Sequence, residues 1–322
     1  MARRDRGVVG LWGAWITAAV VICGWPGQIA ADDTDADAQG DRAVAQLEAR
    51  YRKESNTREW EMLDFVGCRM WREDAARVVR EHPEAVRRYV TANDGSEVAD
   101  ELIVVLGDAG GKENVDFLIE RAAKKPTWAL VIALGRTNDP RTWPSLRKVM
   151  TGEKWALAPE AAFTLARAQD REIIPTLKAW LASNDAKKLG AALRVAQILA
   201  AKDLLPALRE AEPRVSDADR DTLYLTLVAC GDDKYLDKVH ERAVDDSEYI
   251  EKSKMKSPDP AMVVYVWNYR QNQALDAIAK LASPRSLPTL DRLAAGASDP
   301  NIRKRATEIA KQIRKQSAPS PA

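Results

Sequence analysis

Few residues of this 322-residue chain are suited to acid–base or nucleophilic chemistry. The two histidines, His82 and His240, are too far apart in a repetitive helical chain to share a metal or a proton. His240 alone could act as a general base, but a partly exposed surface histidine is the simpler interpretation. No nucleophile elbow or zinc-protease motif is present, and the Gly-Gly-Lys at 110–112 is too short for a phosphate-binding loop. We therefore predict no catalytic residues, no metal and no cofactor.

A column of charged side chains is a better candidate for recognition. It begins with three cations spaced 31 residues apart, Arg147, Lys178 and Arg209. His240 and then Asp291 occupy the later equivalent positions. Cations at equivalent places in stacked repeats would form a ladder with a spacing of about 10 Å, able to bind an acidic partner or an anionic polymer. The alternative is a solvated face, because acidic residues lie alongside.

Tryptophans provide a second candidate. Trp143 and Trp180 align with apolar residues of the other repeats, so both are expected in the core. Trp128 and Trp155 instead align with small or polar residues. A large aromatic side chain at such a place either packs against a local irregularity or contacts a partner.

An insertion of about 20 residues, at 245–262, interrupts the later repeats and provides a third candidate. It mixes both charges with Tyr249 and Met255, which are candidate partner-binding residues. Departures from a regular scaffold often carry binding features, and the alternative is a neutral surface loop.

A repeat of 31 residues must position these side chains. The segments 143–146, 174–177 and 205–208 align without gaps, 236–239 continues them, and 287–290 follows the insertion. Three aligned positions are apolar in every copy, and such positions are expected in the core. They are Trp143, Ile174, Leu205, Leu236 and Leu287; Leu146, Leu177, Leu208, Val239 and Leu290; and Leu134, Leu165, Ala196, Leu227 and Ile278.

Each repeat is predicted to fold as two antiparallel amphipathic helices. Its apolar stretches lie about ten residues apart, and a capping residue precedes the second stretch in four of five copies. Those capping residues are Asp139, Asp170, Asp232 and Ser283, with Ala201 in the remaining copy. No sustained alternation of β-branched residues indicates a strand. The predicted fold class is therefore all-α, an α-α superhelix, or solenoid, of stacked helical hairpins.

The residues around 133–146 (ALGRTNDPR, then WPSL) resemble HEAT repeats of the short type named after bilin lyases. The resemblance covers roughly residues 97–315 and concerns core and cap positions, so it implies an architecture and no lyase activity. It further implies that the second helix of each hairpin lines the concave face. Residues 41–96 lack the 31-residue signature and are predicted to form an N-terminal helical cap.

The N-terminus has the pattern of an export signal. Basic residues 1–6 precede an uncharged stretch at 7–25 and small residues near 29–31, so residues 1–31 are predicted to be a cleaved signal peptide; the alternative is a membrane anchor. The acidic segment 32–40 is expected to be a disordered linker and 316–322 a disordered tail. We therefore expect a periplasmic or extracellular protein that contacts a membrane only if the signal is retained.

The mature chain has a nearly neutral composition. The complete sequence has 49 basic and 48 acidic residues, and cleavage would remove three arginines and one aspartate. This balance argues against a nucleic-acid partner. Cys68 and Cys230 lie about five repeats apart, beyond the reach of a disulfide, and Cys230 is expected to be a buried free thiol.

The favoured function is a non-catalytic protein-binding or scaffolding module in an exported compartment. The alternative is a structural subunit or accessory lobe of a larger extracytoplasmic enzyme or secretion complex. An enzyme of unknown class is the third hypothesis.

Overall fold

The structure is a computed structural model that describes residues 33–55, 66–152, 154–247 and 269–318. Within these residues it is all-helical, and no strand is present. The predicted signal segment, residues 1–31, lies outside the described residues. No helix of the described part is both long enough and apolar enough to cross a membrane. The helices are α1 (Asp33–Ser55), α3 (Val66–Glu81), α4 (Pro83–Ala92), α5 (Glu97–Ala109), α6 (Lys112–Lys124), α7 (Trp128–Arg136), α8 (Trp143–Thr151), α9 (Ala158–Arg167), α10 (Ile174–Ala182), α11 (Ala186–Leu199), α12 (Leu205–Ala211), α13 (Asp217–Ala229), α14 (Leu236–Val244), α17 (Tyr269–Leu281), α18 (Leu287–Gly296) and α19 (Pro300–Ser317).

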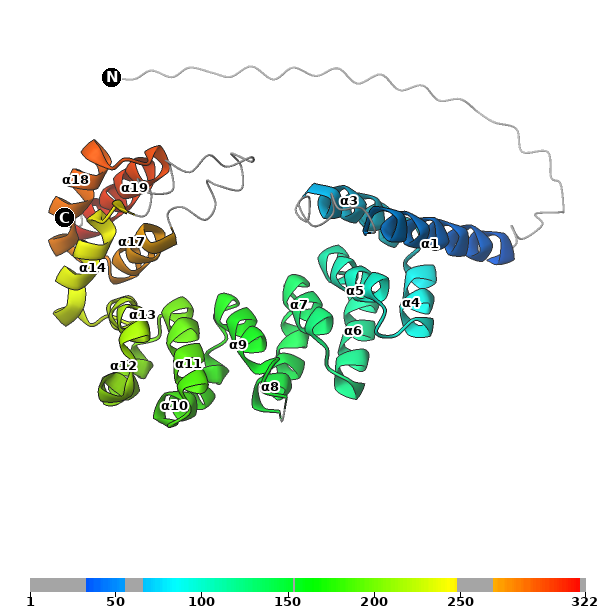
Figure 1. Cartoon of the computed structure of the whole chain (residues 1–322), viewed down its shortest axis with the longest axis horizontal. Coiled ribbons are helices and arrows are strands. Elements are labelled where there is room, and N and C mark those ends of the chain that lie inside the picture. Colours follow the sequence, from blue (N-terminus) through cyan, green and yellow to red (C-terminus); the bar gives the residue numbers. More distant parts are fainter. Residues whose placement is uncertain (1–32, 56–65, 153, 248–268, 319–322) are drawn as a thin grey trace, which may run out of the picture.

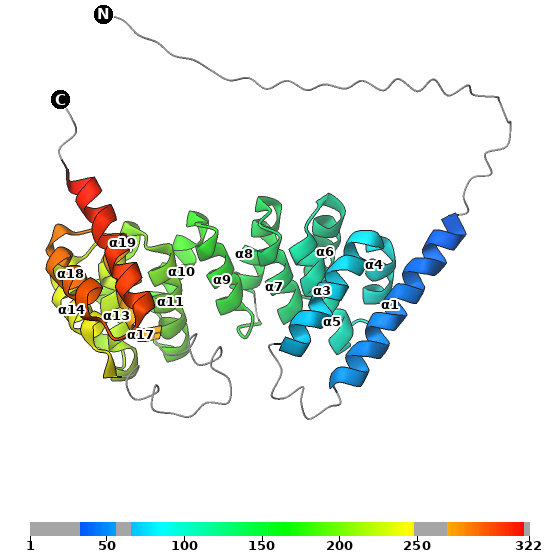
Figure 2. The ribbon, with the colours of Figure 1, turned by 90° about the horizontal axis from the view of Figure 1, so that it is seen from above.

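The helices follow one another around an open arc (Figure 1). The inner row consists of α5, α7, α9, α11 and α13, each in contact with the next, and the outer row includes α6, α8, α10 and α12 (Figure 1). Contacts within the inner row are more extensive than those within the outer row, as curvature toward the inner side requires. Seen from above, the helices of the arc stand side by side between α1 at one end and α19 at the other (Figure 2).

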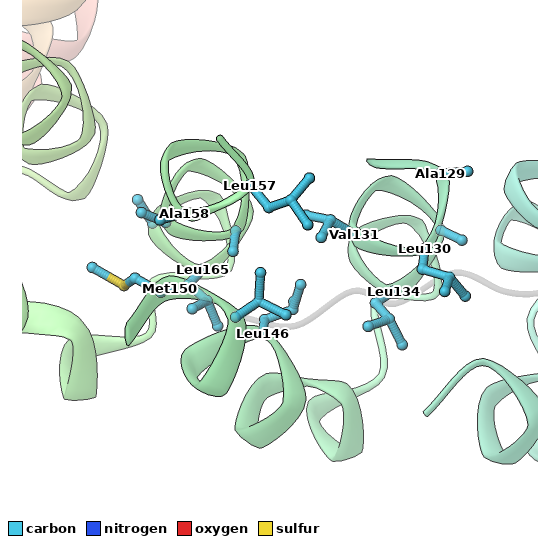
Figure 3. Packing of buried hydrophobic residues seen from close by; sticks show 14 of the residues in the cluster. Ala129, Leu130, Val131, Leu134, Leu146, Met150, Leu157, Ala158 and Leu165 are labelled. Atoms are coloured by element: carbon cyan, nitrogen blue, oxygen red, sulfur yellow. The ribbon is translucent and has the colours of Figure 1, made fainter. Parts of the chain in front are cut away.

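The column two residues after the aligned prolines is buried in every copy, from Leu146 to Leu290. The column that contains Leu134 and Leu165 is likewise buried, and Figure 3 shows these two side chains with Leu146 where α7, α8 and α9 meet. These two predicted core columns are therefore confirmed. The column before the proline is less uniform, because Trp143, Leu205 and Leu287 are only partly buried while Ile174 and Leu236 are buried.

The prolines occupy equivalent places, since each begins an outer helix: α8, α10, α12 and α18. A short 3-10 turn precedes each of these helices and α14. All four predicted capping side chains accept a backbone hydrogen bond, in the turns before α8, α10, α14 and α18. One residue before each cap position, the backbone has a positive φ. These residues are Asn138, Gln169, Ala200, Gly231 and Ala282. The spacing of the repeat is therefore present in the backbone as well as in the core.

The N-terminal helices differ in one respect from the prediction. Residues 33–40 were expected in a disordered linker, but α1 begins at Asp33. The small Gly40 allows α1 to approach α4 closely, because a Cβ at this position would lie 2.8 Å from Cβ of Ala85. Asp37 and Asp41 also form ion pairs with Arg88 of α4. Packing and charge pairing thus order an acidic segment whose composition alone indicated disorder. At the other end, α19 continues to Ser317, two residues into the expected tail.

The buried apolar residues form two clusters that meet on α13. Leu223 and Leu227 belong to the cluster that extends toward α1, whereas Leu225 and Val228 belong to the cluster that extends toward α19. Cys230 lies in the first cluster as a buried free thiol, as predicted, and burial raises its pKa to about 12. Because this thiol is free, no disulfide joins it to Cys68.

Candidate binding surface

The predicted cation ladder is on the opposite side of the molecule from that expected. The second helix of each hairpin was expected on the concave face, but α8, α10 and α12, which carry Arg147, Lys178 and Arg209, form the outer row (Figure 1). The helices of the inner row are the first helices of the predicted hairpins. The core pattern could not distinguish the two sides, because both helices of a hairpin bury one apolar stripe.

Arg147 is occupied by contacts within the protein. Its Nε lies 3.3 Å from Oδ2 of Asp170 in the next repeat, and its guanidinium also pairs with Glu172. The Asp170 side chain is 4% exposed and caps the following 3-10 turn. Nε and Oδ2 are not aligned as a hydrogen bond, so their attraction is that of an ion pair. Burial raises the pKa of Asp170, and the Arg147 charge opposes that shift.

Arg209 repeats this arrangement with Asp232, the cap of the next repeat. Its Nε and Nη2 both lie 2.9 Å from Oδ2 of Asp232, whose side chain is 6% exposed. Where the next cap is Ala201, the column carries Lys178, which is exposed and forms no ion pair with the described residues. The column therefore carries an arginine where the cap of the next repeat is an aspartate, and a lysine where that cap is an alanine. Arg147 and Arg209 join neighbouring repeats, which leaves only Lys178 of the predicted ladder available to a partner.

His240 occupies the same column and also contacts the next repeat. Its Nε2 lies 3.0 Å from Oγ of Ser286, and its Nδ1 lies 3.9 Å from Oδ1 of Asp237. These residue types can form a nucleophilic triad, but Ser286 is completely buried and cannot meet a substrate. The distance to Asp237 is also too long for a hydrogen bond. The arrangement therefore serves packing between α14 and the turn before α18.

The two tryptophans proposed as contacts have different surroundings. Trp155 is partly buried and packs edge to face on Trp180, with ring centroids 4.9 Å apart. It is thus a packing residue, next to the core residue Trp180. Trp128 is 52% exposed and begins α7, behind its cap Thr127. Of these two candidates, only Trp128 presents a large apolar surface to solvent.

The other two candidates, Tyr249 and Met255, belong to the insertion. Residues 248–268 are outside the part that the structure describes. Their assignment as partner-binding residues stays a prediction.

A groove between α7 and α9 was not found by sequence reasoning. Its volume is about 720 Å³, within the range of ligand sites in proteins. Its lining includes apolar Ile132, Trp143 and Leu146, with charged side chains around them. Trp128 and Ile132 lie on one face of α7 because they are four residues apart. Trp128 therefore lies one helical turn before Ile132 on α7.

Gly135 positions the two walls of this groove. A Cβ at Gly135 would lie 2.5 Å from Cγ2 of Thr164 on α9, so only glycine allows α7 and α9 to approach this closely. The sequence gives a signal for this contact, because a glycine also occurs 28 residues earlier, at Gly107 on α5. A Cβ at Gly107 would overlap the backbone of Ala133.

Charged residues form a second column, at the ends of the inner helices. Asp108 on α5 and Arg136 on α7 pair at 2.6 Å, and both line the groove. The next member, Arg167 on α9, also lines the groove and is exposed. Its aligned neighbours are the cation Arg136 and the apolar Ile198. Arg167 consequently forms no ion pair with any residue that the structure describes.

The described side chains contain no group of three or more histidine, cysteine or acidic residues placed to hold a metal ion. The groove contributes hydroxyl, amide and charged side chains around an apolar floor. Such a lining is suited to recognition by shape, apolar contact and ion pairing.

No protein-family model matches the chain. No curated protein shows significant similarity to it.

Proposed function

We propose that this chain is a HEAT-like helical solenoid that acts as a non-catalytic binding or scaffolding module for a protein partner. The repeated helix starts, turns and core positions support the solenoid assignment. The pattern of residues 1–31 supports export, and the periplasm or the extracellular space is the proposed location.

The groove between α7 and α9 carries this proposal. It has an apolar floor and an unpaired cation, and the exposed Trp128 begins α7, one of its two helices. Exposed tryptophan and arginine are enriched among residues that dominate protein interfaces. On the outer face, Arg147 and Arg209 are paired within the protein, and no exposed tryptophan is found there among the described residues. The inner face is therefore the proposed binding face.

Photo-crosslinking in the native cell envelope tests this assignment of faces. A photoreactive amino acid replaces Trp128 on the inner face or Lys178 on the outer face of the full chain. We expect a defined protein adduct from position 128 and little or none from position 178. A further variant, Arg167→Glu, carries the crosslinker at position 128 and should lose the adduct, because it replaces the unpaired cation of the groove by an anion.

Equal adducts from both positions, or an adduct at position 178 alone, would contradict the inner-face proposal. Thermal unfolding of each variant, followed by circular dichroism, must give an unchanged midpoint, so that loss of the adduct reports recognition and not folding.

A further inference from the structure

We propose that the Arg167 guanidinium binds a side-chain carboxylate of the partner, on a segment whose neighbouring apolar residues enter the groove between α7 and α9. This inference rests on the proposed function and specifies the chemistry of the partner at that site. The occupant is an acidic and apolar peptide segment.

The unpaired charge of Arg167 is the first argument. In the same column, Arg136 is neutralised by Asp108 of the preceding inner helix. Arg167 has no such neighbour, because the equivalent position on the preceding inner helix, α7, is the cation Arg136. The charge of Arg167 is therefore free to pair with an anion from outside the chain. The same column later holds Lys280, whose Nζ donates to the carbonyl oxygen of Ile198 at 3.1 Å, so this cation is also satisfied within the protein. Arg167 is thus the exception among the column's cations.

The apolar floor is the second argument. Ile132 and Trp143 are partly buried and line the same groove as Arg167. A volume of about 720 Å³ accommodates more than one side chain. An ion pair at the edge of an apolar groove is screened less than one on an open surface, so a carboxylate flanked by apolar residues fits better than a free anion.

The helix ends favour a side-chain carboxylate over a chain terminus. The C-termini of α7 and α9 lie at this end of the groove and present carbonyl oxygens, whereas capture of a terminal carboxylate relies on backbone N–H groups. An arginine fork binds a carboxylate through two parallel hydrogen bonds without such groups. Glu160 also lines the groove, seven residues before Arg167 and therefore about 10 Å from it along α9. Its charge disfavours a second acid at that end of the groove.

Peptide selection on the purified full chain tests the proposal. A library of random nonapeptides is displayed on phage through their C-termini, so that the segments offer no free terminal carboxylate. We expect the enriched peptides to carry one aspartate or glutamate between apolar residues. Fluorescein-labelled synthetic copies, amidated at the C-terminus, are then titrated by fluorescence anisotropy.

Replacing the peptide acid by its amide should weaken binding to the wild-type chain about tenfold, as expected for a charge-assisted contact. The same replacement should change binding to Arg167→Gln less than about twofold, since the two changes remove one interaction. Lys178→Gln, on the outer face, is the matched control and should bind like the wild type. The unfolding midpoint of Arg167→Gln should equal that of the wild type.

Three outcomes would overturn the inference: no enriched peptide, enriched peptides without an acid, or equal affinity of the wild type and Arg167→Gln. The peptide whose side-chain acid is replaced by an amide can also be made with a free C-terminal carboxylate. If this form restores binding, the site recognises a chain terminus, and the inference is rejected. If the inference is rejected but position 128 still gives a crosslink to a protein, the proposed function is still supported. Acid-dependent peptide binding with equal crosslinking on both faces would reject the function alone.

Discussion

The outer and inner charge columns have the same repeat spacing but different surroundings. On the outer side, Arg147 and Arg209 contact the buried caps of the next repeat and so connect hairpins. On the inner side, the pairing stops at Arg136, and Arg167 faces a groove. A regular column of charge is therefore not evidence of a binding ladder. In this molecule, two of the three cations that repeat on the outer side are used to join hairpins.

The difference arises from the neighbouring repeat. An arginine in the outer column accompanies an aspartate cap, whereas Lys178 accompanies Ala201. A buried aspartate without a cation is costly, so its presence requires the arginine. On the inner side, no buried acid among the described residues lies opposite Arg167. The charge of Arg167 is therefore available to solvent or to a partner.

The largest expected effect is at the outer column. Arg147→Ala leaves the buried Asp170 without a cation and should lower the free energy of unfolding by about 2–3 kcal/mol. Lys178→Ala, its aligned counterpart, should change that free energy by less than about 0.5 kcal/mol. Urea unfolding followed by circular dichroism measures both. Equal effects of the two substitutions would show that the outer pairs do not join the repeats.

The second expected effect concerns the walls of the inner groove. Gly135→Ala places a methyl group against Thr164 and should destabilise the protein by about 1–2 kcal/mol. Adding Thr164→Ala should recover most of this loss, because it removes the atoms that clash. The single Thr164→Ala variant is the control for the same urea measurement. Failure of the double variant to recover stability would argue against close contact of α7 and α9.

The third prediction concerns the turn that joins the inner and outer rows. Ala200 has φ 51°, in the left-handed region that favours glycine. Ala200→Gly should therefore stabilise the protein by about 0.5 kcal/mol, the relief of strain exceeding the added freedom of the unfolded chain. Ala192→Gly, within α11, should instead destabilise it by about 1 kcal/mol. Differential scanning calorimetry compares the two, and a loss of stability in Ala200→Gly would contradict the strain argument.

The smallest expected effect is on pH dependence. Burial lowers the pKa of His240 from 6.5, with Arg285 and Arg292 acting in the same direction and Asp237 opposing them. A lowered pKa in the folded state means that the unfolded state binds the proton more readily. The resulting stability is present above pH 6.5 and is lost as the pH falls through the folded pKa. His240→Gln should therefore lose less stability than the wild type between pH 7 and pH 5, measured by urea unfolding at each pH. If the stability of the wild type and of His240→Gln changes equally with pH, His240 is not the cause of the pH dependence.

The sequence predicted the all-helical class, two of the three core columns and the four capping residues. These features depend on local chemistry that each repeat displays again, so aligned positions reinforce one another. Asp139, for example, accepts from the backbone N–H of Arg141, as its cap position predicted. The free, buried state of Cys230 followed from the same alignment.

Features that depend on contacts between repeats were not predictable in this way. The side of the arc on which a column lies is set by the relative extent of inner and outer helix contacts, which a hydrophobic pattern does not encode. The packing of Trp155 on Trp180 and the ordering of residues 33–40 also require neighbours that are distant in sequence. Gly135 and the unpaired Arg167 both line the groove, and neither residue is distinctive alone.

The shared position of α13 has a consequence for how the molecule opens. Since its two faces belong to different apolar clusters, we expect α14 and α17–α19 to separate together as one cooperative block, exposing Leu225 and Val228 to water. Lys280 on α17 donates a hydrogen bond to the carbonyl oxygen of Gln197 on α11, 83 residues earlier in the chain. This bond connects the two clusters past α13. The amides of α17–α19 should therefore exchange their hydrogens together, at a rate that depends on this hydrogen bond.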